Sequence, residues 1–224
     1  MSLSVKGQGE NRKVTVKGNK KPCLIYCHGD SVTANSNSYA GFLKNIAQSG
    51  APISVTVVNA ATSGQNMIYL LANLQTQVLQ YNPDVITLCV LLNELGDTSV
   101  STRITDYVTA CLAHTNPNGK KPFIFLMTDN FCGQNIGLGY ARTQADQDAA
   151  HTRIITVYNS LAASNSNIRV CDNYPVFKAL GVDTPQLYAV LDSASVHPND
   201  AGVKIITKNL SVSFAQLMQL FYNS

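Results

Sequence analysis

The sequence predicts an α/β protein, organised as a three-layer α/β/α sandwich around a central, mainly parallel sheet of five strands. Short segments that are almost continuously apolar alternate with longer segments of helical periodicity, and no repeat, low-complexity tract or linker interrupts them. Continuously apolar segments are typical of parallel strands buried on both faces. Strands that alternate with helices form right-handed βαβ units, which place helices on both faces of the sheet.

The strands and helices follow from these two periodicities. The segments predicted as strands are Cys23–Cys27, Ile53–Val58, Val85–Leu92, Phe123–Met127 and Ile168–Cys171. The segments predicted as helices are Tyr39–Gln48, Met67–Tyr81, Thr102–His114, Ala141–Ala163 and Ala201–Tyr222. Within Met67–Tyr81, apolar residues recur at steps of three and four, which indicates one buried helix face.

Composition indicates one globular domain with a neutral polar surface. The chain has 224 residues, of which 45% are hydrophobic, and this is enough for an ordinary hydrophobic core. Only 13% of the residues are charged, about half the usual share, so neutral polar residues must cover the surface. Such a surface suits contact with glycans.

The first residues differ from the rest in charge. Residues 1–20 are predicted as a basic N-terminal arm or edge strand, and residues 21–224 as the domain. Six cations against one glutamate lie within residues 1–21. The arm lacks interleaved aromatic residues and precedes a slightly acidic body, so we do not expect it to bind nucleic acid. Residues 14–18 resemble the end of a strand from a preceding β-rich region, so the chain can also be read as the terminal domain of a larger surface protein.

Several classes of protein and site are disfavoured. The sequence contains no run of 18 apolar residues that would predict a membrane span, and its first residues lack the apolar core and cleavage site expected of a signal peptide. We therefore expect a soluble protein, with an extracellular or surface-associated location left open and no indication of oligomeric state. Six cysteines are too dilute for a disulfide framework, and Cys23, Cys27 and His28 have no second ligand pair for zinc. We expect buried strand thiols, with neither metal nor cofactor.

Polar residues follow the first four predicted strands, where ligands bind in folds of this class. These clusters are His28–Ser31, Asn59–Asn66, Asn93–Glu94 and Asp129–Asn130. A fifth cluster, Asp192–Pro198, precedes the last predicted helix. The active site is therefore expected at this edge of the sheet.

Several candidate residues have a structural role as an alternative to a functional one. Ser31 follows a strand in a tight turn, where unpaired backbone N–H groups could stabilise an oxyanion, but a turn and helix cap explain it equally well. Gly64 would allow close approach to a ligand. Asn93 could donate to an oxyanion or cap the next helix, and His197 stands at the entrance to the last helix. The histidines at 28, 114 and 151 are expected to be structural or solvated.

Taken together, these residues resemble the blocks of the GDSL, or SGNH, hydrolase family, over nearly the whole chain from Lys21. The letters S, G, N and H of the second family name correspond here to Ser31, Gly64, Asn93 and His197. The resemblance implies a flavodoxin-like fold in which Ser31 is the nucleophile and His197 its general base. It also implies an oxyanion hole formed by the N–H groups of Ser31 and Gly64 and the Asn93 amide, without metal or organic cofactor.

The sequence departs from the family pattern in three places. The usual Gly-x-Asn-Asp is Leu91-Leu92-Asn93-Glu94, and Val32 replaces a leucine. The family's aspartate lies three residues before the histidine, where this chain has Ala194. Asp192 lies five residues before it. Either a longer loop lets Asp192 complete a triad, or the enzyme uses a Ser–His dyad with another orienting group.

The resemblance and the neutral polar composition together predict a serine ester hydrolase, and within that class a carbohydrate O-acetylesterase that acts on a glycan or small-molecule ester. A lysophospholipase or thioesterase of the same family is the nearest alternative. A non-catalytic glycan-binding module that kept the fold is the second alternative, because Ala194 stands where the family has its aspartate.

Overall fold

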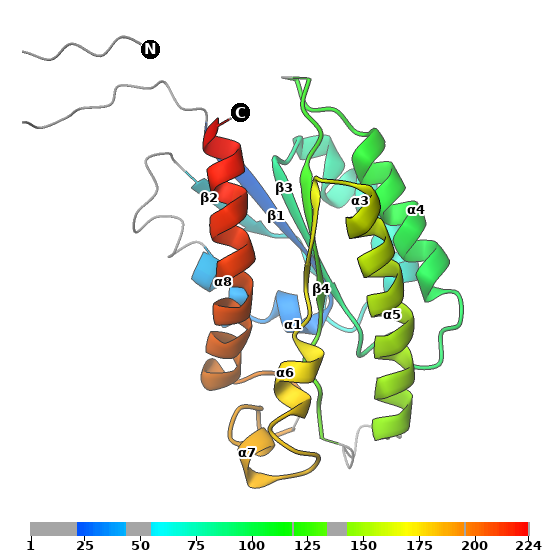
Figure 1. Ribbon diagram of the computed structural model, residues 1–224, viewed down its shortest axis with the longest axis vertical. Helices are drawn as coiled ribbons and strands as arrows, with labels where there is room; N and C mark the ends of the chain where they lie inside the picture. Colours follow the sequence, from blue (N-terminus) through cyan, green and yellow to red (C-terminus); the bar gives the residue numbers. More distant parts are fainter. Residues whose placement is uncertain (1–21, 44–54, 118, 134–142, 195, 224) are drawn as a thin grey trace, which may run out of the picture.

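The structure is a computed structural model that describes residues 22–43, 55–117, 119–133, 143–194 and 196–223 (Figure 1). The predicted N-terminal arm, residues 1–20, lies outside these ranges, as do residues 44–48 of the first predicted helix. Residues 53–54 of the second predicted strand and 141–142 of the fourth predicted helix also lie outside them.

Five parallel strands form the central sheet, in the order β2-β1-β3-β4-β5. Their bounds are β1 Cys23–Gly29, β2 Val55–Asn59, β3 Val85–Val90, β4 Phe123–Thr128 and β5 Ile168–Cys171. The predicted α/β fold with a parallel five-stranded sheet is confirmed. All six residues of β3 are buried, which accounts for its unbroken apolar sequence.

Helices cover both faces of the sheet (Figure 1). The helices α3, α4 and α5 lie side by side on one face, and α1 and α8 lie on the other. Their bounds are α1 Ser31–Ala34, α3 Met67–Gln77, α4 Val100–Ala113, α5 Gln144–Ser164 and α8 Asp200–Asn223. A further helix begins at residue 39 and is described as far as residue 43. The three predicted layers are present.

Two parts of the chain differ from the prediction. The helix expected over Met67–Tyr81 ends at Gln77 and is followed by a separate 3₁₀ turn, η1 (Leu79–Tyr81). Pro83 disfavours helical geometry at Asn82, which adopts a left-handed conformation with φ 55°. Two short helices, α6 (Tyr174–Lys178) and α7 (Pro185–Tyr188), were not predicted, because four or five residues are too few to show a helical period.

The strand order places the site. The chain runs from β1 outward to β2, then crosses back to β3 on the other side of β1. In open α/β sheets, ligands bind beyond the carboxyl ends of the strands at such a switch point. The residues after β1 and β3, which include Ser31 and Asn93, therefore lie where a substrate is expected.

His28, near the end of β1, is a structural residue as predicted. It is fully buried, and its ring nitrogens lie 2.7 Å from Tyr107 Oη and 3.2 Å from Gln77 Oε1. Burial lowers the pKa of His28 to about 4, although the hydrogen bond with Gln77 opposes this change. The imidazole is therefore neutral in the folded protein at neutral pH.

We expect His28 to make the free energy of unfolding fall as the pH drops from about 6.5 to about 4. In that window the unfolded chain binds a proton at His28 that the folded protein does not, which costs up to about 3 kcal/mol in total. Buried acids with raised pKa values act in the opposite direction, so the comparison must be with a variant. In denaturant titrations over this range, His28→Gln should lose less stability with falling pH than the unchanged protein. Equal slopes for the two proteins would contradict the assignment.

Candidate active site

Ser31 is the first residue of α1, directly after the turn that follows β1. Asp30 caps this helix, because its Oδ1 accepts a hydrogen bond of 2.9 Å from the Val32 N–H. The turn and helix cap that the sequence allowed as a structural alternative are therefore present. They also hold the Ser31 side chain at the carboxyl edge of the sheet, half-buried.

The loop before α8 brings His197 and Asp192 to Ser31. His197 Nε2 lies 2.8 Å from Ser31 Oγ, and His197 Nδ1 lies 3.1 Å from Asp192 Oδ2. The serine and histidine are 166 residues apart in the chain, so the fold alone creates their contact. Hydroxyl, imidazole and carboxylate thus form one continuous hydrogen-bonded chain, which is the arrangement that activates a serine nucleophile.

The five-residue spacing between Asp192 and His197 is accommodated by a closed loop. The Asp192 N–H donates to the His197 carbonyl over 2.7 Å, and Leu191 and Pro198 form an antiparallel bridge beside it. Asp192 Oδ1 accepts from the N–H groups of Val196 (3.1 Å) and His197 (3.3 Å). Its other oxygen therefore faces the imidazole. Of the two possibilities that the sequence left open, the geometry matches a longer loop in which Asp192 reaches His197.

Asn199 and Gly202, which follow His197 in the chain, hold this loop against α8. The sequence analysis gave neither of them a role. The Asn199 amide donates to the carbonyls of Ala189 and Leu191, while its oxygen accepts from the first turn of α8. Gly202 allows close packing, since a Cβ there would lie 2.2 Å from the Val190 carbonyl oxygen. Both follow His197 within five residues, so their position next to the predicted general base was the available signal.

Gly64 and Ser31 offer backbone donors for an oxyanion. Gly64 is exposed with φ 74°, a left-handed conformation that favours glycine, and it follows β2 at the same edge of the sheet. Among the described residues, the N–H groups of Ser31 and Gly64 make no hydrogen bond. Both are therefore free to donate to a ligand.

Asn93, the third predicted oxyanion donor, follows β3 and has its amide already engaged. Its Nδ2 donates to Asp30 Oδ2 over 3.0 Å and to the Gln65 carbonyl over 2.9 Å. Both amide hydrogens thus have protein acceptors in this structure. A donation from Asn93 to an oxyanion must replace one of these bonds.

Three buried carboxyl groups surround the back of the site. Asp30, Asp129 and Glu94 are each at most 1% exposed. Burial raises the pKa of Asp129, and burial together with the Asp129 charge raises the pKa of Asp30. Burial also raises the pKa of Glu94 to about 7, although its Oε1 accepts a hydrogen bond from the Met67 N–H. The sequence showed Asp129 and Glu94 only as polar residues at strand ends.

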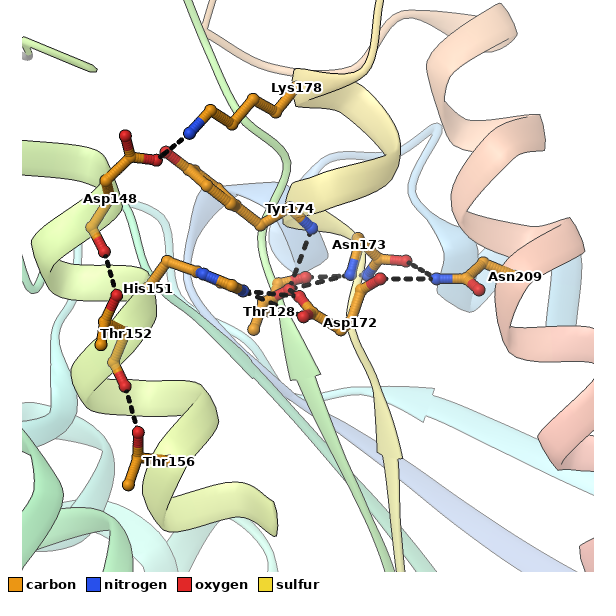
Figure 2. Close-up of polar contacts among 10 residues, drawn as sticks. All are labelled: Thr128, Asp148, His151, Thr152, Thr156, Asp172, Asn173, Tyr174, Lys178 and Asn209. Atoms are coloured by element: carbon orange, nitrogen blue, oxygen red, sulfur yellow. Dashed lines mark hydrogen bonds and ion pairs between the residues drawn. The ribbon is translucent and has the colours of Figure 1, made fainter. Parts of the chain in front are cut away.

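A separate polar cluster fixes the ends of β4 and β5 (Figure 2). His151 stacks on Tyr174 with ring centroids 4.4 Å apart, and its Nε2 lies 2.9 Å from Asp172 Oδ2. Asp172 Oδ1 also accepts from the Thr128 hydroxyl over 2.7 Å. This cluster joins α5 to the chain that leads from β5 into α6, which agrees with the structural role expected for His151.

Neither metal nor disulfide chemistry is indicated in the described part of the chain. No group of three or more histidine, cysteine or acidic side chains there could hold a metal ion. All six cysteines are buried, as predicted for the thiols in the strand segments, Cys23, Cys27, Cys89 and Cys171. None of the described helices is long and apolar enough to cross a membrane.

Comparison with known proteins identifies the family and related folds. A profile of the GDSL-like lipase/acylhydrolase family matches residues 27–205. The structure is similar to a lipase/acylhydrolase from Enterococcus faecalis, with a TM-score of 0.65, 18% identity, and coverage of 85% of this chain and 94% of that one. It is also similar to Axe2, an acetylxylan esterase from Geobacillus stearothermophilus, with a TM-score of 0.64, 18% identity, and coverage of 84% and 91%.

A third similar structure is the acetyl xylan esterase AlAXEase, with a TM-score of 0.67, 17% identity, and coverage of 85% of this chain and 98% of that one. At these identities the similarity concerns the fold. Comparison with curated protein sequences finds no match.

Proposed function

The chain belongs to the GDSL-like lipase/acylhydrolase family and is a carboxylic ester hydrolase, and we propose that it is a serine esterase that removes acetyl groups from carbohydrates. The observation that carries the proposal is the hydrogen-bonded chain Ser31–His197–Asp192, with bonds of 2.8 and 3.1 Å. A glycan-binding module without catalysis would not need this chain of bonds.

In the proposed mechanism, His197 is the general base for Ser31. As Ser31 Oγ attacks the ester carbonyl carbon, His197 Nε2 takes its proton, and the carbonyl π electrons move to oxygen to give a tetrahedral oxyanion. The Asp192 carboxylate accepts from His197 Nδ1, which keeps Nε2 unprotonated beforehand and stabilises the imidazolium afterwards.

The N–H groups of Ser31 and Gly64 and the Asn93 amide would hold the oxyanion. The two backbone donors are free, whereas Asn93 would exchange its bond with the Gln65 carbonyl for one with the oxyanion. One such donor typically contributes about 100- to 1000-fold in rate.

Collapse of the intermediate completes the acylation. The C–O bond to the alcohol breaks, and the imidazolium gives its proton to the departing sugar oxygen, which leaves an acetyl group on Ser31. Water then attacks the acyl-enzyme while His197 takes a proton from it, and acetate leaves as Ser31 recovers its proton. Apart from the ester and one water molecule, these steps use only groups of the chain itself.

Composition supports an acetylated carbohydrate as the substrate. Only 13% of residues are charged, so the surface is polar but mostly neutral, as neutral glycans require. Two of the similar folds are acetylxylan esterases by name. A lysophospholipase or thioesterase would need an apolar site for its acyl chain. The sequence has no apolar segment that would form a lid over such a site.

Turnover of a series of nitrophenyl esters tests the proposal. We expect the highest kcat/KM on the acetate ester and a steep fall from butyrate to octanoate, together with acetate release from acetylated xylan. Ser31→Ala, measured on the same substrates, controls for contaminating esterases. Higher kcat/KM on octanoate than on acetate would instead favour the lysophospholipase or thioesterase alternative. Absence of Ser31-dependent turnover on every ester would favour the non-catalytic module.

A further inference from the structure

Asp129 lies directly after β4, behind the site and without contact with solvent. Its Oδ2 accepts a hydrogen bond of 2.8 Å from the Leu92 N–H, and its Oδ1 lies 3.2 Å from Cys89 Sγ. Leu92 is the residue before Asn93, so Asp129 fixes the backbone from which the Asn93 side chain extends.

Asp129 also acts on the Asn93 side chain, through Asp30. Burial, the charge of Asp129 and a hydrogen bond between the two carboxyl groups raise the pKa of Asp30. Burial also raises the pKa of Asp129, so one proton shared by the two carboxyl groups is favoured over two negative charges. Asp30 Oδ2 in turn accepts from Asn93 Nδ2 over 3.0 Å.

The same pair reaches the nucleophile. Asp30 Oδ1 accepts from the Val32 N–H and thereby caps α1, the short helix that begins with Ser31. One buried carboxyl pair thus connects the backbone of the nucleophile with both the backbone and the amide of the third oxyanion donor. One hydrogen of the Asn93 amide is donated to Asp30 and the other to the Gln65 carbonyl. If the bond to Asp30 is kept, only the second hydrogen can be donated to a ligand instead.

We propose that Asp129 is a positioning residue for the oxyanion hole: it holds Asp30 and the Leu92 N–H so that the Asn93 amide is aimed at the developing oxyanion. The role rests on the proposed function, because it concerns the same site. Asp129 itself touches no reacting atom.

Three variants separate positioning from mere stability. Asp129→Ala removes the acceptor for the Leu92 N–H and the contact with Asp30. Asp129→Asn keeps an oxygen for the Leu92 N–H and offers an N–H to an ionised Asp30, so it should restore the arrangement. Asp84→Ala is the matched control, since Asp84 is another buried aspartate, at the amino edge of the sheet, and accepts from the Leu24 N–H and the Asn116 amide.

On p-nitrophenyl acetate, we expect Asp129→Ala to lower kcat at least about tenfold with KM within about threefold, a fraction of the cost of losing a whole oxyanion donor. Asp129→Asn should stay within about threefold of the unchanged protein in both constants. Asp84→Ala should lower the Tm but leave kcat per folded molecule unchanged. If Asp129→Ala does not fold, Asp129→Ser takes its place with the same expectation.

The rate of Ser31 labelling by a fluorophosphonate is measured on the same variants, since it needs the nucleophile and the oxyanion donors but no particular ester. A loss of labelling in Asp129→Ala that Asp129→Asn restores supports the role even if the natural ester class is different. Failure of the proposed function appears separately, as a protein that labels at Ser31 but does not release acetate from glycans. An unchanged kcat and labelling rate in folded Asp129→Ala overturns the inference, as does an equal loss in Asp129→Asn.

Discussion

Replacing Ser31 with alanine is expected to abolish ester hydrolysis, with a loss of about six orders of magnitude in kcat. The hydroxyl is the group that His197 Nε2 contacts at 2.8 Å, and no other nucleophile is placed there by the described residues. Ser31 is half-buried in a helix of four residues, so the Tm should change little. Nitrophenyl acetate turnover and thermal melting on the same preparation check both statements.

His197→Ala provides the partner measurement. Residues that act as one unit are strongly non-additive, so the double variant should be scarcely worse than either single variant. If the two losses multiplied instead, Ser31 and His197 would act independently, and the shared proton transfer would be refuted. Turnover that persists in a contaminant-free Ser31→Ala protein would refute the nucleophile itself.

Asp192→Asn is expected to lower kcat by up to about 10⁴-fold. The amide keeps an oxygen for the N–H groups of Val196 and His197, so the loop should remain closed. What is lost is the anionic partner of His197 Nδ1 at 3.1 Å, and with it the imidazole tautomer that leaves Nε2 free. The measurement is kcat at saturating acetate ester.

The matched control for this change is Asp172→Asn, in the other His–Asp pair (Figure 2). Asp172 lies 2.9 Å from His151 Nε2 and accepts from Thr128, but it has no contact with Ser31. We expect a lower Tm with kcat unchanged. A nearly silent Asp192→Asn would mean that another group orients His197, as in the Ser–His dyad.

The fold and the position of the site could be predicted because both depend on local patterns. Strand β3 is buried on both faces and is therefore apolar throughout, and the amphipathic period of α3 is visible from Met67 onward. Ser31 and Asn93 each come within three residues after a strand, and His197 comes three residues before a helix. Ser31 and Asn93 lie at one edge of the sheet because β1 and β3 are parallel, as the alternation of strands and helices predicts.

The rest depends on contacts that no local pattern encodes. Asp129 meets Leu92 across 37 residues, and Asn93 meets Asp30 across 63, so their roles appear only when the strand ends are packed together. The short helices α6 and α7 each have a proline in the first turn, and Thr184 caps α7, so neither depends on a hydrophobic period. Whether Asp192 reached His197 depended on backbone bonds within a loop, which spacing alone leaves free.

The closed loop between Leu191 and Pro198 has a consequence for how such enzymes are found. The distance between acid and base is set by the bond from the Asp192 N–H to the His197 carbonyl, not by the number of residues between them. Residues at its tip, such as the exposed Ala194, can therefore be replaced, inserted or removed during evolution while the two ends stay joined. Searches that require a fixed interval between aspartate and histidine will pass over chains in which, as here, a closed loop joins the two residues. A search for an aspartate whose loop closes on the histidine, at any interval, will retain them.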